Sequence, residues 1–301
     1  MTLLVISFLV FGAFALIPGD PVTSMLGTQA TPAKIAAMRA KFGLDQPFLV
    51  RYGKWLLGLL HGDMGNSYSY KVSVASLVAD KIPITLTLTL MAFVIMMVIS
   101  IPLGIYTSRH ENSPVDRIIF GLNQLVMAIP PFFGGILITF LFGKLLHLFT
   151  PGGYVSYDRN FGRFLGYLFF PALAIAFPKA AMAVKLLRSS LLAEIRADYV
   201  RTAYSRGNRT NAVFYSHCLK NAIIPVITFL GMAVVEMMVG SIIIEQVFSI
   251  PGLGRILLTS ISNRDYPVVE AIIMCIALMV LVSNFVVDLI YQIVDPRITI
   301  E

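Results

Sequence analysis

Charge and cysteine are both scarce in this 301-residue chain. Only 13% of its residues are charged, 57% are hydrophobic, and the mean hydropathy is +0.81. Soluble domains are about one quarter charged, so this much apolar side chain cannot all be buried in a water-soluble core of this size. The composition argues against an ordinary soluble domain and indicates that lipid surrounds much of the chain.

Several chemical motifs are also missing. Cys218 and Cys275 are too few for a disulfide framework, and neither cysteine is spaced for metal binding with another Cys or His. His217 likewise has no neighbour at ligand spacing, so we expect it to pack or to lie at an interface. No G-x-x-x-x-G-K-[ST] phosphate loop and no Ser/His/Asp constellation is visible. We therefore expect a non-catalytic chain that holds no cofactor or metal and does not hydrolyse ATP itself.

The net charge of +7 would suit a nucleic-acid partner, but its placement argues against one. The lysines and arginines gather in loops between apolar runs, which is the pattern that orients helices in a bilayer. The most basic connection lies between the fourth and fifth apolar runs and is expected in the cytoplasm, so six spans place both termini inside. Lys144, Arg159 and Arg163 then fall outside and weigh against this orientation.

A helix needs about 20 apolar residues to cross the roughly 30 Å hydrocarbon core. Six segments reach or approach that length, and in the third Pro130-Pro131 removes backbone donors and predicts a kink. The fourth is expected to be interrupted by Pro171 and Pro178. The sequence predicts an all-α membrane protein with these spans: Leu3 to Ile17, Ile84 to Tyr106, Ile118 to about Leu146, about Phe164 to Leu187, Ala222 to Ile244, and Ala271 to Val294.

The first apolar run has an alternative interpretation as a cleaved signal peptide. No basic region precedes it and no A-x-A-like cleavage site follows it, so a retained helix is expected. The missing basic flank leaves open that native residues precede Met1. The expected division is a first transmembrane helix over 1–17, an outer helical segment over 18–81, a permeation core over 82–294 and a cytoplasmic tail over 295–301.

The outer segment should contain two helices. One is expected to start at Thr31-Pro32 and stop at Gly43, and a second to run from about Pro47 to Leu60. The segment is interpreted either as a cap packed on the membrane core or as a docking surface for an external partner. Residues at three- and four-residue spacing predict one buried face on the first helix: Ile35, Met38 and Phe42.

The connection 188–221 is long, charged and compatible with helix. Tyr199, Thr202 and Ala203 share one turn and give it a small, semi-apolar face, which Gly207 would end. Small residues flanked by charge suit insertion into a groove on another protein. A basic loop beside a membrane could equally contact anionic lipid.

Residues Arg196 to Pro225 (RADYVRTAYSRGNRTNAVFYSHCLKNAIIP) resemble the EAA loop of ABC importer permeases. More narrowly, the chain resembles the first, B-type subunit of the oligopeptide/dipeptide/nickel permease family. The resemblance follows the family order over nearly the whole chain. Its other motifs are Pro18-Gly19-Asp20-Pro21, Gly43 to Pro47 with Gly62 to Ser67, Val247 to Gly254 (VFSIPGLG), Arg264 to Val269 (RDYPVV), and Val287-Asp288-Leu289 to Asp295-Pro296-Arg297.

This resemblance implies a type I importer permease fold in a bacterial plasma membrane, with a helical cap outside the membrane. It implies a second homologous permease subunit, two cytoplasmic ATPases that use ATP and Mg²⁺, and an extracytoplasmic substrate-binding protein. Arg201 replaces the glutamate of the EAA motif, and His217, Leu219 and Lys220 depart from its later residues. By this register the ATPase contact would be made by Asp198, Tyr199, Arg201, Thr202, Ala203 and Gly207.

Within the spans, Glu236 is the most unusual residue, because a carboxylate in an apolar segment is costly and usually faces a protein interior or a water-filled path. It is interpreted either as a translocation-route residue that meets a cationic substrate group or as a protonated or paired structural carboxylate. Asn123 and Gln124 are candidates for the same route, with hydrogen bonding between helices as the alternative.

Glu245 and Arg255 flank a turn that, by resemblance, contributes to an outer gate; a purely structural turn is the alternative. The gate candidates are Glu245, Pro251, Gly252 and Gly254. The expected function is import of di- or oligopeptides, with nickel or a metal complex as the alternative within the family. A self-contained channel or secondary transporter is the alternative from another class, although no internal repeat supports it.

Overall fold

The computed structural model describes residues 1–16, 22–23 and 31–294. The motif at positions 18–21 and the tail 295–301 lie outside these residues. Within the described part the chain is helical, and the only β-type pairing there is an isolated bridge between Asn66 and Ser73. The chain forms two compact units, Met1–Thr85 with Pro251–Leu281 and Leu86–Ile250 with Val282–Glu301, which are described separately below.

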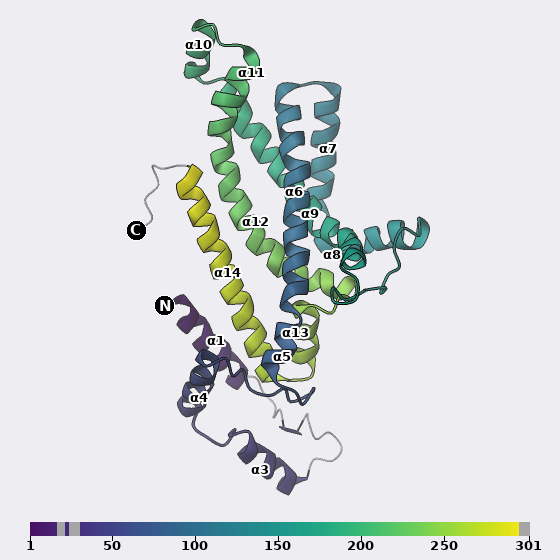
Figure 1. Cartoon of the computed structure of the whole chain (residues 1–301), viewed down its shortest axis with the longest axis vertical. Helices are drawn as coiled ribbons and strands as arrows, with labels where there is room; N and C mark the ends of the chain where they lie inside the picture. The colour runs from purple at the N-terminus through teal and green to yellow at the C-terminus, as the bar shows by residue number, and fades with distance from the viewer. Residues whose placement is uncertain (17–21, 24–30, 295–301) are drawn as a thin grey trace. The chain divides into compact units, whose positions relative to one another are not determined.

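The helices follow one another along the whole described chain (Figure 1). Two of them, η2 and η3, are π-helices, in which each turn is wider than in an α-helix. Their bounds are α1 Thr2–Leu16, α3 Pro32–Lys41, α4 Phe48–Leu60, α5 Val74–Ala79, α6 Ile82–Arg109, α7 Pro114–Ala128, α8 Pro131–Ile138, η2 Thr139–Leu145, α9 Phe161–Ile195, α10 Asp198–Ser205, α11 Thr210–Ala212, η3 Val213–Cys218, α12 Leu219–Val247, α13 Leu253–Ser262 and α14 Tyr266–Val294.

Four helical stretches of the described chain are long and apolar enough to cross a membrane, and a fifth is added if α7 and α8 form one broken span. The four are Val74–Arg109, Phe161–Ile195, Thr210–Val247 and Tyr266–Leu289. The expected first span corresponds to α1, which has 15 residues. At 1.5 Å per residue it extends about 22 Å, less than a hydrocarbon core, so it counts as a shorter apolar helix.

The expected kink at Pro130-Pro131 is confirmed, and the structure has a complete break between two helices at this point. Helix α7 ends at Ala128, α8 begins at Pro131, and their axes differ by 105°. Figure 1 shows α8 running across the direction of α7. Two successive prolines leave the backbone there without donors and hold it extended, so the helix stops and restarts in a new direction.

The expected interruption of the fourth span is wrong. Helix α9 runs unbroken through Pro171 and Pro178 and reaches Ile195, so it extends beyond the expected end at Leu187. Its alanine-rich buried face packs against α12, α7 and α8. Packing of neighbouring helices on both sides stabilises α9 despite the lost backbone hydrogen bonds. Likewise α11, η3 and α12 are continuous from Thr210, which leaves only residues 196–209 to connect the two spans.

Small residues let helices of the second unit approach closely. A Cβ added at Gly231 of α12 would lie 2.4 Å from Val287 Cγ1 of α14, and one added at Gly104 of α6 would lie 2.8 Å from Leu187 Cδ2 of α9. Such close contact is how helices associate where lipid removes the hydrophobic driving force.

In the first unit, the two helices expected between Thr31 and Leu60 are confirmed as α3 and α4. Thr31 accepts a hydrogen bond from Lys34 N, and Gly43 follows α3 with φ of 63°. Helix α4 packs on α1 through aromatic rings, with Phe11 5.4 Å from Trp55 and Phe8 5.3 Å from Tyr52 between ring centroids. The expected buried face of α3 is only half-buried.

A buried carboxylate joins two distant segments of this unit. Asp265, which is fully buried, accepts hydrogen bonds from Ser67 Oγ at 2.5 Å, Tyr68 N at 2.9 Å and Ser69 N at 3.0 Å. Its own carbonyl accepts from Val269 N in the first turn of α14. Asp265 therefore fixes the loop 66–73 to the start of the last helix.

Candidate coupling site

Helix α10, Asp198–Ser205, lies at the centre of the segment that the sequence singled out. Asp198 in its first turn suits the positive end of the helix dipole. At its other end Gly207 has φ of 80°, Gly207 N donates to Tyr204 O at 2.9 Å, and Asn208 N donates to Ala203 O at 3.3 Å. These two bonds form a Schellman motif, so the expected helix end at Gly207 is confirmed.

One face of α10 packs into its own chain. Val200 and Ala203 are 3% and 7% exposed and belong to a core cluster with Leu187, Val213 and Phe214. Ala203 therefore packs inward and does not lie on the exposed face. The opposite face is polar and exposed, at positions spaced three and four apart: Asp198, Arg201, Thr202 and Ser205.

Tyr199 links α10 to the two long helices beside it. Its hydroxyl donates to Glu194 Oε2 of α9 at 2.5 Å and accepts from Asn221 Nδ2 of α12 at 3.3 Å. Burial raises the pKa of Tyr199, and the hydrogen bond to the Glu194 carboxylate raises it further. The hydroxyl is therefore protonated and remains a donor throughout the neutral pH range.

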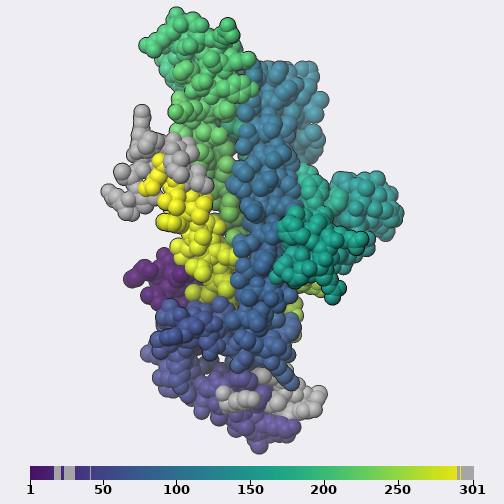
Figure 2. Space-filling model, viewed as in Figure 1, coloured from purple at the N-terminus to yellow at the C-terminus, as the bar shows by residue number. Residues whose placement is uncertain are grey.

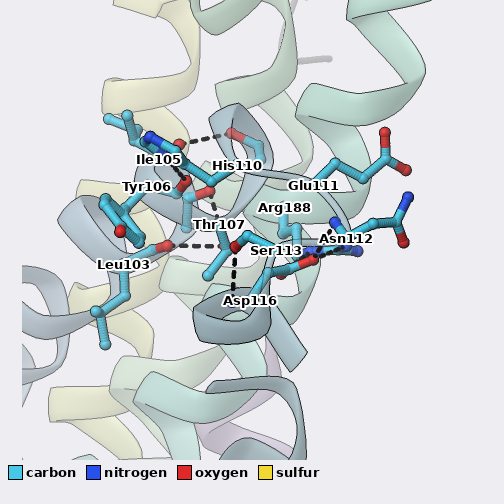
Figure 3. A network of polar contacts seen from close by, with 12 residues as sticks. Leu103, Ile105, Tyr106, Thr107, His110, Glu111, Asn112, Ser113, Asp116 and Arg188 are labelled. Atoms are coloured by element: carbon cyan, nitrogen blue, oxygen red, sulfur yellow. Dashed lines mark hydrogen bonds and ion pairs between the residues drawn. The ribbon is translucent and has the colours of Figure 1, made fainter. Parts of the chain in front are cut away.

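An arginine–aspartate pair fixes α9 to the turn between α6 and α7. Arg188 donates from Nε to Asp116 Oδ1 at 2.8 Å and from Nη2 to Asp116 Oδ2 at 2.7 Å. Asp116 is buried and also accepts from Asn112 N, while Ser113 caps α7 by accepting from Asp116 N. Figure 3 shows Arg188 directed at this turn. These two parallel charge-assisted hydrogen bonds fix both the distance and the relative orientation of the Arg188 and Asp116 side chains.

Two further arginines hold the same region. Arg196 Nη2 lies 2.8 Å from Glu111 Oε1. Arg109 at the end of α6 donates to Asn211 Oδ1 at 2.7 Å and to Tyr215 Oη at 3.2 Å. Nothing in the sequence reveals which side chain each of these two arginines meets.

The α10–α11 segment projects from one end of the second unit. In Figure 2 it extends, in green, beyond the ends of α6 and α7 in blue. The polar exposed face of α10 is thus carried on a projecting helix that Tyr199 and the core cluster hold against α9 and α12. The Arg188–Asp116 pair in turn joins α9 to the start of α7, so a push on α10 can pass to α9 and α12 directly and to α7 through α9.

Glu236 has a partner that the sequence does not reveal. Lys179 Nζ of α9 forms an ion pair and hydrogen bond with Glu236 Oε2 of α12. The pair lies between two apolar spans, and the Glu236 side chain is 58% exposed. Exposed apolar residues continue the same stripe of α12 at helical spacing: Met232, Val239 and Ile243. In the sequence, the only indication of this partner is Lys179 itself, a single lysine inside an apolar run.

The remaining route candidates are less distinctive. Asn123 of α7 is half-buried and Gln124 is exposed. The structure does not bring either of them together with the Lys179–Glu236 pair through any contact described here. Their expected role on the route stays a prediction.

The outer-turn candidates are mostly buried. Helix α12 ends in a second Schellman motif, in which Ile250 N donates to Glu245 O at 2.8 Å and Ser249 has φ of 57°. Glu245 is fully buried. In the first unit Pro251 is half-buried, Gly252 and Gly254 are buried, and Leu253 N donates to Thr85 Oγ1 at 2.9 Å. This geometry is that of a tightly packed turn, and the gate role stays a prediction.

In the described part of the chain no group of three or more His, Cys, Asp or Glu side chains is placed to hold a metal ion. Cys218 is a buried free thiol in the core cluster around α10, and Cys275 is a half-buried free thiol.

Comparison with known proteins agrees with these features. A family model described as "Binding-protein-dependent transport system inner membrane component" matches residues 100–300, and the N-terminal model of the same systems matches residues 1–89. The oligopeptide transport system permease protein AppB of Bacillus subtilis is 35% identical over 299 residues, covering 98% of this chain and 95% of its own.

Two more relatives extend the likeness. A putative peptide transport system permease protein of Brucella abortus is 34% identical and covers 98% of this chain and 94% of its own. The dipeptide transport system permease protein DppB of Alkalihalophilus pseudofirmus is 31% identical, covering 96% and 92%. The resemblance to B-type permease subunits is thereby confirmed. The chain belongs to the family of inner membrane components of binding-protein-dependent transport systems and is a multi-pass helical permease of that family.

Proposed function

We propose that this chain is the B-type permease subunit of an ATP-driven importer for di- or oligopeptides delivered by a substrate-binding protein. The observation that carries the proposal is that peptide permeases match the chain from end to end, over 96% to 98% of its length. A match of that extent covers both the membrane-spanning helices and the connection that contains α10.

Such a system needs an ATPase and a binding protein as partners, and we infer a second homologous permease subunit and two ATPase subunits. The exposed polar face of α10 supports an ATPase partner, because Asp198, Arg201 and Thr202 have no role in their own chain's core. The basic residues around α10 support a cytoplasmic position for this helix, on the side of the membrane where ATP is available. Both termini would then be cytoplasmic.

The coupling mechanism follows from how α10 is held. Closure of the ATPases on ATP would move α10, and its contacts with Glu194, Asn221 and the core cluster would carry that movement to α9 and α12. The Arg188–Asp116 pair would carry it on to the α6–α7 turn. Switching of the helices between two arrangements would change the side on which the route is open.

The Lys179–Glu236 pair supports a route along the exposed stripe of α12. An ion pair in contact with lipid tails is costly, and ionisable residues in spans usually face other helices or water. An exposed Glu236 in the isolated chain therefore suits a face covered by a second permease subunit or by water of the route. On this proposal the carboxylate serves both to pair with Lys179 and to border the path of the peptide.

A charge exchange separates these two roles. Glu236→Gln leaves Lys179 unpaired, whereas the double variant Lys179→Glu with Glu236→Lys restores a pair of reversed direction. If the pair borders the route, the exchanged variant should assemble normally but transport charged peptides with changed preference. Transport of neutral, cationic and anionic peptides at the original rates by the exchanged variant would show that the pair is structural only.

Co-purification tests the proposed assembly. The tagged chain would be extracted from its native membrane in mild detergent, and bound proteins identified by mass spectrometry. We expect a second permease and ATPase subunits, and a binding protein encoded beside them can then be screened with peptides and with nickel. A stable homo-oligomer that conducts without ATP would contradict the proposal.

A further inference from the structure

A cavity of about 980 Å³ lies within the first unit. Its walls come from the end of α1, the end of α3, α4, the segment 63–68 and the start of α14. Aromatic rings make up much of the wall, and several are paired: Phe11 with Trp55, Phe42 with Tyr68, and Phe14 with Tyr266.

Five ionisable side chains line this cavity: Arg39, Arg51, Lys54, Asp63 and Glu270. Among them, Glu270 and Arg51 attract each other without forming a direct ion pair. Glu270 is 6% exposed, lines the cavity, and makes no hydrogen bond or ion pair with any described residue. Arg51, also in the lining, is close enough to interact electrostatically with Glu270, but its guanidinium lies over the Phe11 ring, 5.7 Å from the centroid. The charged form of a buried carboxyl group without donors is costly, so a ligand that supplies an ammonium group would stabilise the charged form of Glu270.

We propose that this cavity binds a short zwitterionic peptide, whose terminal ammonium meets Glu270 and whose terminal carboxylate meets Arg51 and the neighbouring Lys54. This inference rests on the proposed peptide import and gives that function a binding site on the permease itself. The aromatic rings would hold apolar side chains of the peptide and contribute cation–π attraction to its ammonium.

The dimensions and the polar groups fit this class of ligand. Sites for small ligands usually enclose about 300–1,000 Å³ and combine apolar walls with a few polar groups. Burial raises the pKa of Tyr68 to about 12, so its hydroxyl stays neutral and adds a hydrogen-bond donor to the wall. Lys54 donates to Gln46 Oε1 at 2.9 Å, which positions its ammonium at the same cavity.

An aminophospholipid headgroup offers the same chemistry, since phosphatidylethanolamine also carries an ammonium beside an anion. The peptide is the better fit, because the aromatic lining suits apolar side chains and a headgroup has none. The test must therefore include lipids with and without phosphatidylethanolamine.

The chain carries its own probe, because Trp55 in the cavity wall is its only tryptophan. The full-length chain would be placed in phosphatidylglycerol nanodiscs and titrated with trileucine, N-acetyl-trileucine and trileucine amide while Trp55 emission is recorded. We expect a saturable change with trileucine and about tenfold weaker binding of both blocked peptides, since each lacks one charge-assisted bond.

Two variants make the result specific. Glu270→Gln should weaken trileucine about tenfold yet leave the affinity for N-acetyl-trileucine unchanged, a selective loss that misfolding would not produce. Asp158→Asn, an exposed acidic residue in the other unit, should change neither affinity. Equal binding of free and acetylated peptide, or no saturable response to any peptide, would overturn the inference. A response only to added phosphatidylethanolamine would overturn it too.

This test separates the site from the proposed function. The assembled importer with Glu270→Gln would be assayed for uptake of the same peptides. If the wild-type importer takes up peptides but Trp55 emission does not respond to them, the cavity is not a peptide site and the proposed peptide import is still supported. A selective Trp55 response in a chain whose assembled system moves no peptide would retain the site and remove the proposed function.

Discussion

At the scale of single residues, two buried carboxylates hold the chain in different ways. Asp116 is neutralised by the bidentate Arg188, whereas Asp265 is held by one hydroxyl and two backbone N–H groups. Both residues follow a turn and precede or begin a long helix, so each carboxylate fixes where that helix starts. The unpaired Glu270 contrasts with both, and this contrast is why it suggests a ligand.

Arg188→Ala should destabilise the second unit by about 3 kcal/mol, because it leaves Asp116 buried without its counter-ion. The Arg188 side chain is 22% exposed, so the effect belongs at the low end of the usual range for a broken buried pair. The midpoint of thermal unfolding in detergent should fall. Arg188→Lys keeps the charge but loses the fork geometry and should give a smaller fall. An unchanged midpoint for Arg188→Ala would contradict this account of the pair.

Asp265→Ala should loosen the loop 66–73, since Ser67 Oγ and the N–H groups of Tyr68 and Ser69 lose their acceptor. Each buried donor left unsatisfied costs about 1–3 kcal/mol. Hydrogen exchange at residues 66–73 should become faster, while exchange in α9 stays unchanged. Asp265→Asn retains one acceptor oxygen and should show a smaller increase. Equal protection of the loop in all three proteins would argue against the anchoring role.

At the scale of helices, close approach and capping determine the arrangement. In the described chain five α-helices end in left-handed residues with paired C-terminal carbonyls, at Gly43, Gly62, Gly207, Ser249 and Arg264. These ends set the directions of the chain after α3, α4, α10, α12 and α13. Along the spans, Gly104 and Gly231 bring neighbouring helices together.

Gly231→Ala should destabilise the contact between α12 and α14, because its Cβ would lie 2.4 Å from Val287 Cγ1. A forced overpacking of this kind costs about 1–3 kcal/mol. The thermal midpoint should fall and should recover when Val287→Ala is added. Gly240→Ala in the same helix is the control, since a Cβ added at Gly240 would meet no atom within 4 Å apart from the backbone of its own helix and its chain neighbours. A fall of the same size for Gly240→Ala would contradict the packing explanation.

Arg201→Glu should uncouple the permease from its ATPase without unfolding it, because Arg201 lies on the exposed face of α10. In the purified importer, peptide uptake should fall by about tenfold or more, a normal size for a coupling between sites. The thermal midpoint and the subunit composition should not change. Lys34→Ala, at an exposed position of α3, is the control. Full uptake by Arg201→Glu would remove this face from the proposed contact.

Helix positions were largely predictable from the sequence, but their lengths and partners were not. Apolar runs and the Thr31 and Gly207 caps indicated most elements, because these features act within one segment. The continuity of α9 through Pro171 was missed because packing by other helices decides it. Lys179 and Arg188 were missed as partners because pairing depends on distances across the fold. The burial of Ala203 was not predictable, because a short helix has few residues to define its orientation.

At the scale of the whole molecule, the family likeness and the arrangement of α10 describe a subunit that acts through partners. Its spans, the exposed Lys179–Glu236 pair and the projecting α10 each present a surface that one chain does not cover. The central claim is that the chain moves peptides only within an ATP-driven assembly.

Uptake by proteoliposomes tests that claim most directly. The chain would be reconstituted with its co-purified permease and ATPase subunits, and labelled trileucine supplied with the binding protein. We expect peptide accumulation that requires ATP, the binding protein and this chain together, and no accumulation with the chain alone. Accumulation or ion conduction by the chain alone, without ATP, would contradict the account.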